Sequence, residues 1–199
     1  VNNNRRIDIM RQFNLENGRY FLQITRFEPD NLPLEIAAAF AESGLADRGY
    51  KFVVVGYKEK TDYAGKIKAL EEKPGVMVLK AIYDSEILAI LRENCFCYLH
   101  GNSVGGTNPA LLEAMASCPR VLAIDNIFSH EVLDNTGLFF DPTNITKAFL
   151  QSIESADKRE LMLNRIRNNY QWIAVAESYM RLSEGRPAEY KVSGCEKKP

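Results

Sequence analysis

Short apolar runs that alternate with amphipathic stretches are the feature that most restricts the fold of this chain. The apolar runs have the length of buried strands and fall at residues 20–25, 52–56, 76–79, 95–100, 121–124 and 138–140. Helix-like stretches lie between them, at residues 32–43, 61–72, 85–94 and 109–117. Strands that are apolar on both faces and separated by helices are typical of a parallel sheet covered on both sides. The sequence therefore predicts an α/β fold, a Rossmann-like doubly wound parallel sheet.

Residues that favour helix ends support these boundaries. Asp84 or Ser85 can cap one helix, and Asn108 can cap another with Pro109 at its first position. Residues 143–155 and 157–182 predict one or two further C-terminal helices. The expected organisation is an irregular lead-in at 1–18, the Rossmann-like domain at 19–156, a helical segment of the same domain at 157–186, and a flexible tail at 187–199.

Composition excludes several classes of protein. The chain has 199 residues, of which 46% are hydrophobic and 26% charged, which suits one globular domain. A net charge of −1 and no Lys/Arg run longer than two residues give no electrostatic footprint for nucleic acid. The four cysteines form no CxxC pair, and no apolar run reaches the roughly 18 to 20 residues that cross a bilayer. We expect a cytoplasmic chain with reduced thiols, and the first residue, Val1, indicates a piece of a longer protein.

The segment 98-YLHGNSVGGTNPALLEAM-115 is the most unusual strand end in the sequence. Ligands of doubly wound sheets bind beyond the carboxyl ends of the strands. Gly105 and Gly106 remove side chains there, and the helix that begins at Pro109 turns its positive end toward the same loop. We predict that a phosphate lies over residues 105–108, that is Gly105, Gly106, Thr107 and Asn108. Glu113, expected to be partly buried, would accept hydrogen bonds from a ribose diol.

Each candidate also has a purely structural interpretation. Arg26, at the end of a strand, could pair with a nearby acidic residue instead of binding an anion, and the glycines could only form a turn. His100 could contact the donor, but a histidine that ends a buried strand more often organises the next loop through hydrogen bonds. Trp172 and Tyr179 lie on one helical face and indicate packing rather than a sugar platform.

The segment 98–115 resembles the second half of the E-x7-E signature of retaining GT-B glycosyltransferases of family 4, with Glu113 as the second glutamate. The fuller string is similar to a rhamnosyltransferase-like subgroup in which the first glutamate is replaced, here by Gly105. Residues 21–40 resemble the first strand of the family's C-terminal domain. In that comparison Arg26 matches the arginine that grips the donor diphosphate, and Asn31 stands where many relatives carry lysine.

This resemblance spans roughly residues 19–183 and implies one half of a GT-B fold, the half that binds a nucleotide sugar. Arg26 and Glu113 would be the catalytic residues, and Lys80 and Ala81 would lie in the loop that contacts the nucleobase. The implied enzyme is a hexosyltransferase of polysaccharide biosynthesis that transfers a hexose or deoxyhexose to a glycan or lipid-linked acceptor. A missing N-terminal domain would hold that acceptor and provide any association with the inner membrane face, so this chain alone would be an inactive fragment.

No cofactor or metal is expected beyond the nucleoside-diphosphate sugar itself. An arginine and a helix terminus can neutralise a diphosphate, and no Asp-x-Asp cluster follows a strand. Two other hypotheses stay open, because a fold does not define a function. One is a non-catalytic nucleotide-sugar-binding module. The other is an unrelated flavodoxin-like or epimerase-like enzyme in which the glycine turn holds another phosphate.

Overall fold

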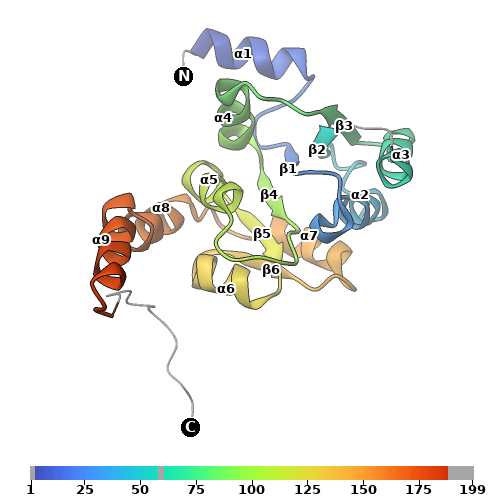
Figure 1. Ribbon diagram of the computed structural model, residues 1–199. Coiled ribbons are helices and arrows are strands. Elements are labelled where there is room, and N and C mark those ends of the chain that lie inside the picture. The colour runs from blue at the N-terminus through green and yellow to red at the C-terminus, as the bar shows by residue number, and fades with distance from the viewer. Residues whose placement is uncertain (1–2, 58–60, 188–199) are drawn as a thin grey trace.

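The computed structural model describes residues 3–57 and 61–187, and within them six strands form one parallel sheet (Figure 1). The strands are β1 (Tyr20–Ile24), β2 (Lys51–Tyr57), β3 (Val76–Lys80), β4 (Cys97–His100), β5 (Val121–Ile124) and β6 (Leu138–Phe140). Their order across the sheet is β3-β2-β1-β4-β5-β6, and all neighbours pair in parallel. This confirms the predicted doubly wound fold. The order reverses between β1 and β4, which is where such sheets bind ligands.

Helices cover both faces of the sheet, as the alternation of strand side chains requires. The helices are α1 (Asn3–Gln12), α2 (Pro33–Glu42), α3 (Asp62–Ala69), α4 (Ser85–Asn94), α5 (Pro109–Ser117), α6 (Ile127–Leu133), α7 (Ile145–Ile153), α8 (Arg159–Asn169) and α9 (Trp172–Ser183), with short 3-10 turns η1 (Pro29–Asn31), η2 (Leu70–Glu72) and η3 (Asp134–Thr136). Phe21 faces the core under α2, α3 and α7, whereas Leu22 faces the core under α1, α4, α5, α6 and α8. Each face therefore has its own hydrophobic core.

The N-terminal segment differs from the expected irregular lead-in, because it forms helix α1. Ile9 and Met10 are buried under this helix, which packs beside α4 (Figure 1). Arg5 also forms an ion pair with Glu86 of α4, with 3.6 Å between Nε and Oε2. The first residues of this helix are Asn and Arg, and its apolar stripe is too short to give a clear helical pattern in the sequence. The stability of the helix therefore comes from packing on α4 rather than from local helix propensity.

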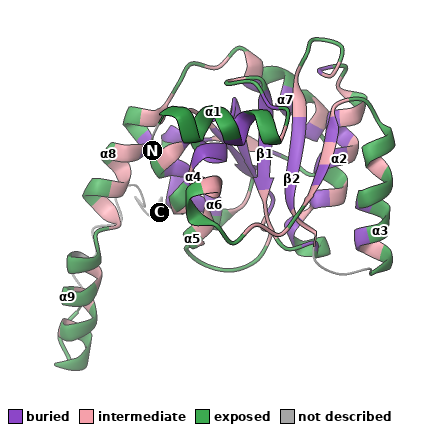
Figure 2. Ribbon diagram, turned by 90° about the horizontal axis from the view of Figure 1, so that it is seen from above, coloured by how far each residue is buried: buried purple, intermediate pink, exposed green. Residues whose placement is uncertain are grey.

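The C-terminal segment is helical, but its described part forms three helices, α7, α8 and α9, instead of the one or two expected. The last of them, α9, projects away from the sheet (Figure 2). Met162 of α8 is buried against the core, whereas Trp172 and Tyr179 of α9 are 86% and 72% exposed. Packing within the described part of the chain therefore does not account for these two aromatic residues. Residues 188–199 of the predicted tail lie outside the described residues. No described helix is both long enough and apolar enough to cross a membrane.

Candidate functional site

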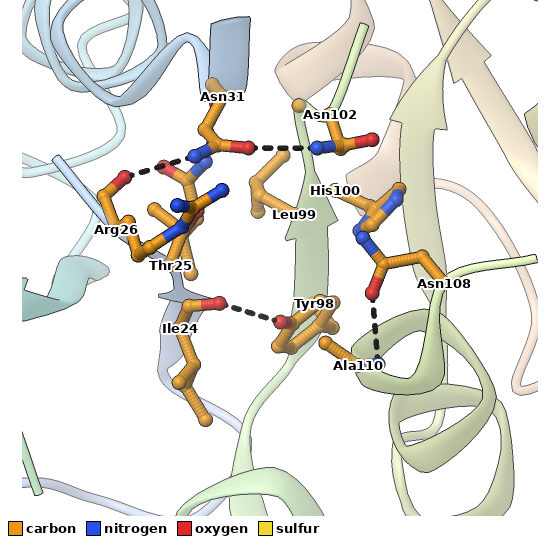
Figure 3. Close-up of a pocket in the computed structure, with 12 residues that line it drawn as sticks. Ile24, Thr25, Arg26, Asn31, Tyr98, Leu99, His100, Asn102, Asn108 and Ala110 are labelled. Carbon is orange, nitrogen blue, oxygen red and sulfur yellow. Dashed lines mark hydrogen bonds between the residues drawn. The ribbon is translucent and has the colours of Figure 1, made fainter. Parts of the chain in front are cut away.

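A polar cavity of about 190 Å³ opens at the switch point between β1 and β4 (Figure 3). We call it the β1–β4 cavity. Its lining comes from the carboxyl ends of both strands, the loops that follow them and the start of α5: Gln23, Ile24, Thr25, Arg26, Asn31, Tyr98, Leu99, His100, Gly101, Asn102, Asn108 and Ala110. Arg26, His100 and Asn108 were all predicted as site residues from the sequence. The fold therefore brings these three together at one cavity.

A second, larger cavity of about 510 Å³ lies on the other side of β1, and we call it the β1–β3 cavity. Ile24, Thr25 and Arg26 line both cavities, so the two are adjacent. Ala81, one of the predicted base-contacting residues, lines the β1–β3 cavity. Lys80 is exposed at the end of β3 and lines neither cavity. The two cavities together have room for an elongated ligand, which would contact Arg26 where they meet.

The Arg26 guanidinium is exposed and forms no hydrogen bond or ion pair with any other described residue. The acidic residues nearby, Glu28 and Asp30, do not pair with it. Its backbone is nevertheless fixed, because the Arg26 carbonyl accepts hydrogen bonds from Asn31 Nδ2 at 3.1 Å and from the Glu28 amide at 2.9 Å. Arg26 therefore presents, from a fixed backbone position, a cation that no described residue neutralises.

Asn31, which the resemblance places at a lysine position, connects the loops after β1 and β4. Its side-chain Nδ2 donates to the Arg26 carbonyl, and its Oδ1 accepts from Asn102 Nδ2 at 2.9 Å (Figure 3). Gln23 Nε2 donates to the Asn31 carbonyl at 2.9 Å. Asn126 Nδ2, at the start of α6, donates to the Asn102 carbonyl at 3.3 Å. This network fixes the two loops relative to each other, and sequence analysis missed it because its members are far apart in the chain.

Two glycines allow the loop after β1 to approach its neighbours closely. A Cβ on Gly101 would lie 3.1 Å from the Asn31 carbonyl carbon and would overlap the carbonyl oxygen. Gly56, at the end of β2, has a φ of +144°, and a Cβ there would overlap the Thr25 carbonyl oxygen. Both positions require glycine for this geometry. A glycine at the end of a buried strand is the sequence signal that could have identified them.

The glycine loop between β4 and α5 presents unpaired backbone amides. Gly105 has a φ of +114°, a conformation that favours glycine over glutamate. The N–H groups of residues 104–108 donate to no other residue in the described part of the chain. The first turn of α5 is instead satisfied, since Asn108 Oδ1 accepts from Ala110 N at 2.9 Å and the Asn108 carbonyl accepts from Leu111 N at 3.0 Å. The amides open to an anion thus belong to the loop rather than to the helix.

His100 ends β4 as a buried, neutral side chain that is 7% exposed. Burial lowers the pKa of the imidazole to about 4. The ring forms no hydrogen bond with another described residue, so the expected role as a hydrogen-bonded organiser of the loop does not apply. In Figure 3 the ring lies beside Asn108, inside the β1–β4 cavity. A neutral imidazole offers a ligand one donor and one acceptor.

The buried His100 should make the fold less stable in acid. Its folded pKa of about 4 is below the unfolded value of 6.5, so the unfolded chain binds more protons as pH falls through this window. We expect a loss of roughly 2 to 3 kcal/mol in the free energy of unfolding between about pH 7.5 and pH 4.5 from this residue alone. His100→Gln should remove this contribution in urea denaturation at both pH values. His130→Gln, which replaces a half-exposed histidine, is the control, and its free energy of unfolding should change with pH as in the wild type.

Glu113 lies on α5 with a side chain that is 56% exposed, so it is not partly buried as expected. Leu111, Ala114 and Met115 occupy the buried face of the helix and leave Glu113 on the outer face. Its Oε2 accepts a hydrogen bond from Arg92 Nη2 at 2.5 Å. Glu113, Gly105, Gly106 and Thr107 line neither cavity, although Ala110, one turn before Glu113, lines the β1–β4 cavity. The carboxylate therefore lies outside both cavities, on the helix that contributes Ala110 to one of them.

The described residues contain no group of three or more His, Cys, Asp or Glu side chains that could hold a metal ion. The polar groups of the site are instead an arginine, a neutral histidine, amides and carboxamides. Such a set suits an anion that also carries hydroxyl groups, because it combines one cation with many hydrogen-bond donors.

Solved structures share this fold over most of the chain at low sequence identity. A trehalose-phosphate synthase from Burkholderia xenovorans matches with a TM-score of 0.72 and 14% identity, covering 90% of this chain and 46% of that one. A sucrose-phosphate synthase from Thermosynechococcus elongatus gives 0.69 and 18%, covering 90% and 48%. The C-terminal domain of a group 1 glycosyl transferase from Francisella tularensis gives 0.66 and 17%, covering 84% and 93%. The fold is thus one half of a GT-B fold, as predicted.

The chain spans 40% to 46% of the length of three trehalose-phosphate synthases that it matches. No curated protein sequence matches it significantly. The family model described as glycosyl transferases group 1 matches residues 5–172, which include every strand and the whole candidate site. Because that match covers well over half of the sequence, the chain belongs to the glycosyl transferases group 1 family.

Proposed function

We propose that this chain is the donor-binding half of a retaining glycosyltransferase of family 4, close to the rhamnosyltransferase-like subgroup. Its donor would be a nucleoside diphosphate linked to a hexose or deoxyhexose. The observation that carries the proposal is that neither the Arg26 guanidinium nor the amides of the loop at 104–108 pair with another described residue, and that both lie at the switch point of the sheet. One cation and a run of amides fit a diphosphate.

The proposed chemistry is electrostatic. Arg26 and the loop amides would bind the diphosphate and stabilise the charge that grows on it as the bond to the sugar breaks. The neutral His100 would exchange hydrogen bonds with the donor without changing its charge. The nucleobase would enter the β1–β3 cavity beside Ala81, which follows Lys80 in the chain. Arginine thus supplies the positive charge, and the proposal needs no metal ion.

The acceptor side of the reaction would come from an N-terminal domain outside this sequence. The exposed apolar residues of α9, Trp172, Ile173, Tyr179 and Met180, support this part of the proposal, since they lack a partner surface in the described part of the chain. Transfer to a glycan or a lipid-linked acceptor in polysaccharide biosynthesis would then take place in the cytoplasm. The same N-terminal domain would supply any contact with the inner face of the membrane.

A second candidate function is a nucleotide-sugar-binding module without catalysis. One observation favours it. Gly105 occupies the first-glutamate position of the family signature with a φ of +114°, where a glutamate would be strained. Turnover by a longer protein that includes the preceding domain would support the enzyme, whereas tight donor binding without turnover would support the module.

Calorimetric titration with nucleoside diphosphates tests the shared donor-binding proposal, and Gly106→Ala is the informative variant. A Cβ on Gly106 meets nothing within 4 Å, so the fold should tolerate it. The added methyl group would stand between the loop amides and a phosphate, and we expect roughly tenfold weaker binding, about 1.4 kcal/mol. Gly65→Ala, on α3, also meets nothing within 4 Å and lines neither cavity, so it should bind like the wild type.

Two outcomes of this titration would count against the proposal. Unchanged affinity in Gly106→Ala would place the phosphate elsewhere. Tight binding of flavin mononucleotide without binding of any nucleoside diphosphate would favour an unrelated phosphate site. Inorganic phosphate serves as the reference that separates simple anion binding from recognition of the whole nucleotide.

A further inference from the structure

Arg92, in the last turn of α4, is a buried arginine that forms an ion pair with Glu113 of α5. The residue is only 8% exposed, which is unusual for arginine. Its Nη2 donates to Glu113 Oε2 at 2.5 Å, and the Glu113 side chain is 56% exposed. The pair is therefore asymmetric, with a cation fixed in the protein and a carboxylate at the surface. Burying the cation is unfavourable without that partner.

The surroundings of Arg92 connect it to the β1–β4 cavity. Burial raises the pKa of the Tyr98 hydroxyl, and the charges of Arg92 and Glu113 act on the same group in opposite directions. Tyr98 lines the cavity and donates to the Ile24 carbonyl at 3.1 Å. Arg92 and Glu113 join α4 to α5, and both charges act on Tyr98 of β4. Arg92 Nε is buried and has no hydrogen-bond partner among the described residues.

The ion pair restricts Glu113 in a way that a free surface glutamate is not restricted. A glutamate on the outer face of a helix samples several rotamers, and ordering it on ligand binding costs conformational entropy. Arg92 holds Oε2 in advance through the ion pair, and a carboxylate offers a ligand acceptor oxygens. Oε1 has no partner in the described part of the chain. That oxygen is available to a hydroxyl group of a ligand.

We propose that Arg92 is a positioning residue that holds Glu113 ready to bind the pentose hydroxyls of the donor nucleotide. This inference rests on the proposed donor-binding function. It assigns Arg92 no contact with the nucleotide, because its Nη2 is occupied by Glu113 and its side chain is buried. Its effect should therefore appear in the recognition of the pentose rather than in the binding of the diphosphate.

Titration with matched ribonucleotide and 2′-deoxyribonucleotide diphosphates measures this effect. The base is whichever one the wild type binds best. Arg92→Met removes the charge and puts in its place an unbranched apolar side chain that a buried site tolerates. We expect the ribonucleotide to bind roughly tenfold more weakly and the preference for ribose over deoxyribose to fall toward unity. Arg92→Lys keeps the charge without the guanidinium and should recover part of that preference.

Two controls separate positioning from a general loss of structure. The ratio between diphosphate and monophosphate affinities should stay unchanged in Arg92→Met, since Arg26 and the loop amides are intact. Arg120→Met also removes a partly buried arginine, one that lies over the Phe96 ring and donates to the Ser155 carbonyl. It should lower the free energy of unfolding and leave the ribose preference as in the wild type.

Glu113→Gln completes a double-mutant cycle with Arg92→Met and keeps the test valid if Arg92→Met fails to fold. We expect Glu113→Gln alone to lose the ribose preference and Arg92→Met to add little in that background. A folded Arg92→Met with the wild-type preference, or a Glu113→Gln with it, would overturn the inference. Absence of any nucleotide binding by the wild type would instead overturn the proposed function on which it rests.

Discussion

Replacing Arg26 with alanine should weaken nucleoside diphosphate binding by about two to four orders of magnitude, the largest effect on binding that we expect at this site. Hydrogen bonds to an ionised partner contribute about 1.5 to 3 kcal/mol each, and a guanidinium can make two of them to a phosphate. The Arg26 side chain forms no hydrogen bond or ion pair with another described residue, so the variant loses no such interaction. Its free energy of unfolding should stay within about 0.5 kcal/mol of the wild type. Calorimetric titration and urea denaturation measure the two quantities.

Arg48→Ala is the matched control for the Arg26 variant. Arg48 is also exposed, but it precedes β2 and therefore lies at the opposite edge of the sheet from the cavities. We expect wild-type affinity from Arg48→Ala and an intermediate affinity from Arg26→Lys, which keeps the charge but loses the planar fork. Equal affinities in Arg26→Ala and Arg48→Ala would remove Arg26 from the anion site.

The sheet could be predicted because each strand is marked by a short apolar run in its own stretch of sequence. Near-continuous apolar runs indicated each strand to within a few residues, and the alternation with helices left a doubly wound sheet as the solution. The largest displacement is at β4, where the predicted run starts at Cys95 and the strand at Cys97, because Cys95 caps the end of α4. The positions of Arg26, His100 and Asn108 at the switch point followed directly from the strand ends.

The expected burial of Glu113 is wrong, because apolar neighbours in the sequence do not enclose a helical side chain. On a helix, adjacent residues point about 100° apart, so Leu112 and Ala114 do not enclose Glu113. The helix at residues 3–12 was missed for a related reason, since only Ile9 and Met10 of it are buried. Pairs such as Asn31 with Asn102 and Arg92 with Glu113 join distant segments, and no local pattern encodes them.

The requirement for glycine at position 56 leads to the largest expected loss of stability. Gly56 combines a φ of +144° with a Cβ position 2.9 Å from the Thr25 carbonyl carbon. Gly56→Ala should therefore cost about 4 kcal/mol, from backbone strain and from overpacking against a neighbouring strand that cannot move freely. The displaced segment would be the end of β1, where the Thr25 amide donates to the Val55 carbonyl at 2.9 Å. The same substitution should thus also displace the backbone of Arg26, which follows Thr25 in the chain.

Gly65→Ala provides the contrast that isolates this effect. Gly65 lies inside α3, its φ is not left-handed, and a Cβ there meets nothing within 4 Å. Alanine in a helix interior is favoured over glycine by about 0.5 to 1 kcal/mol, so this variant should gain stability. Urea denaturation of both variants should then differ by roughly 5 kcal/mol, and folded Gly56→Ala should bind nucleotide more weakly than Gly65→Ala. If the two variants instead unfold with similar free energies, the close approach of β2 to Thr25 does not constrain the loop that carries Arg26.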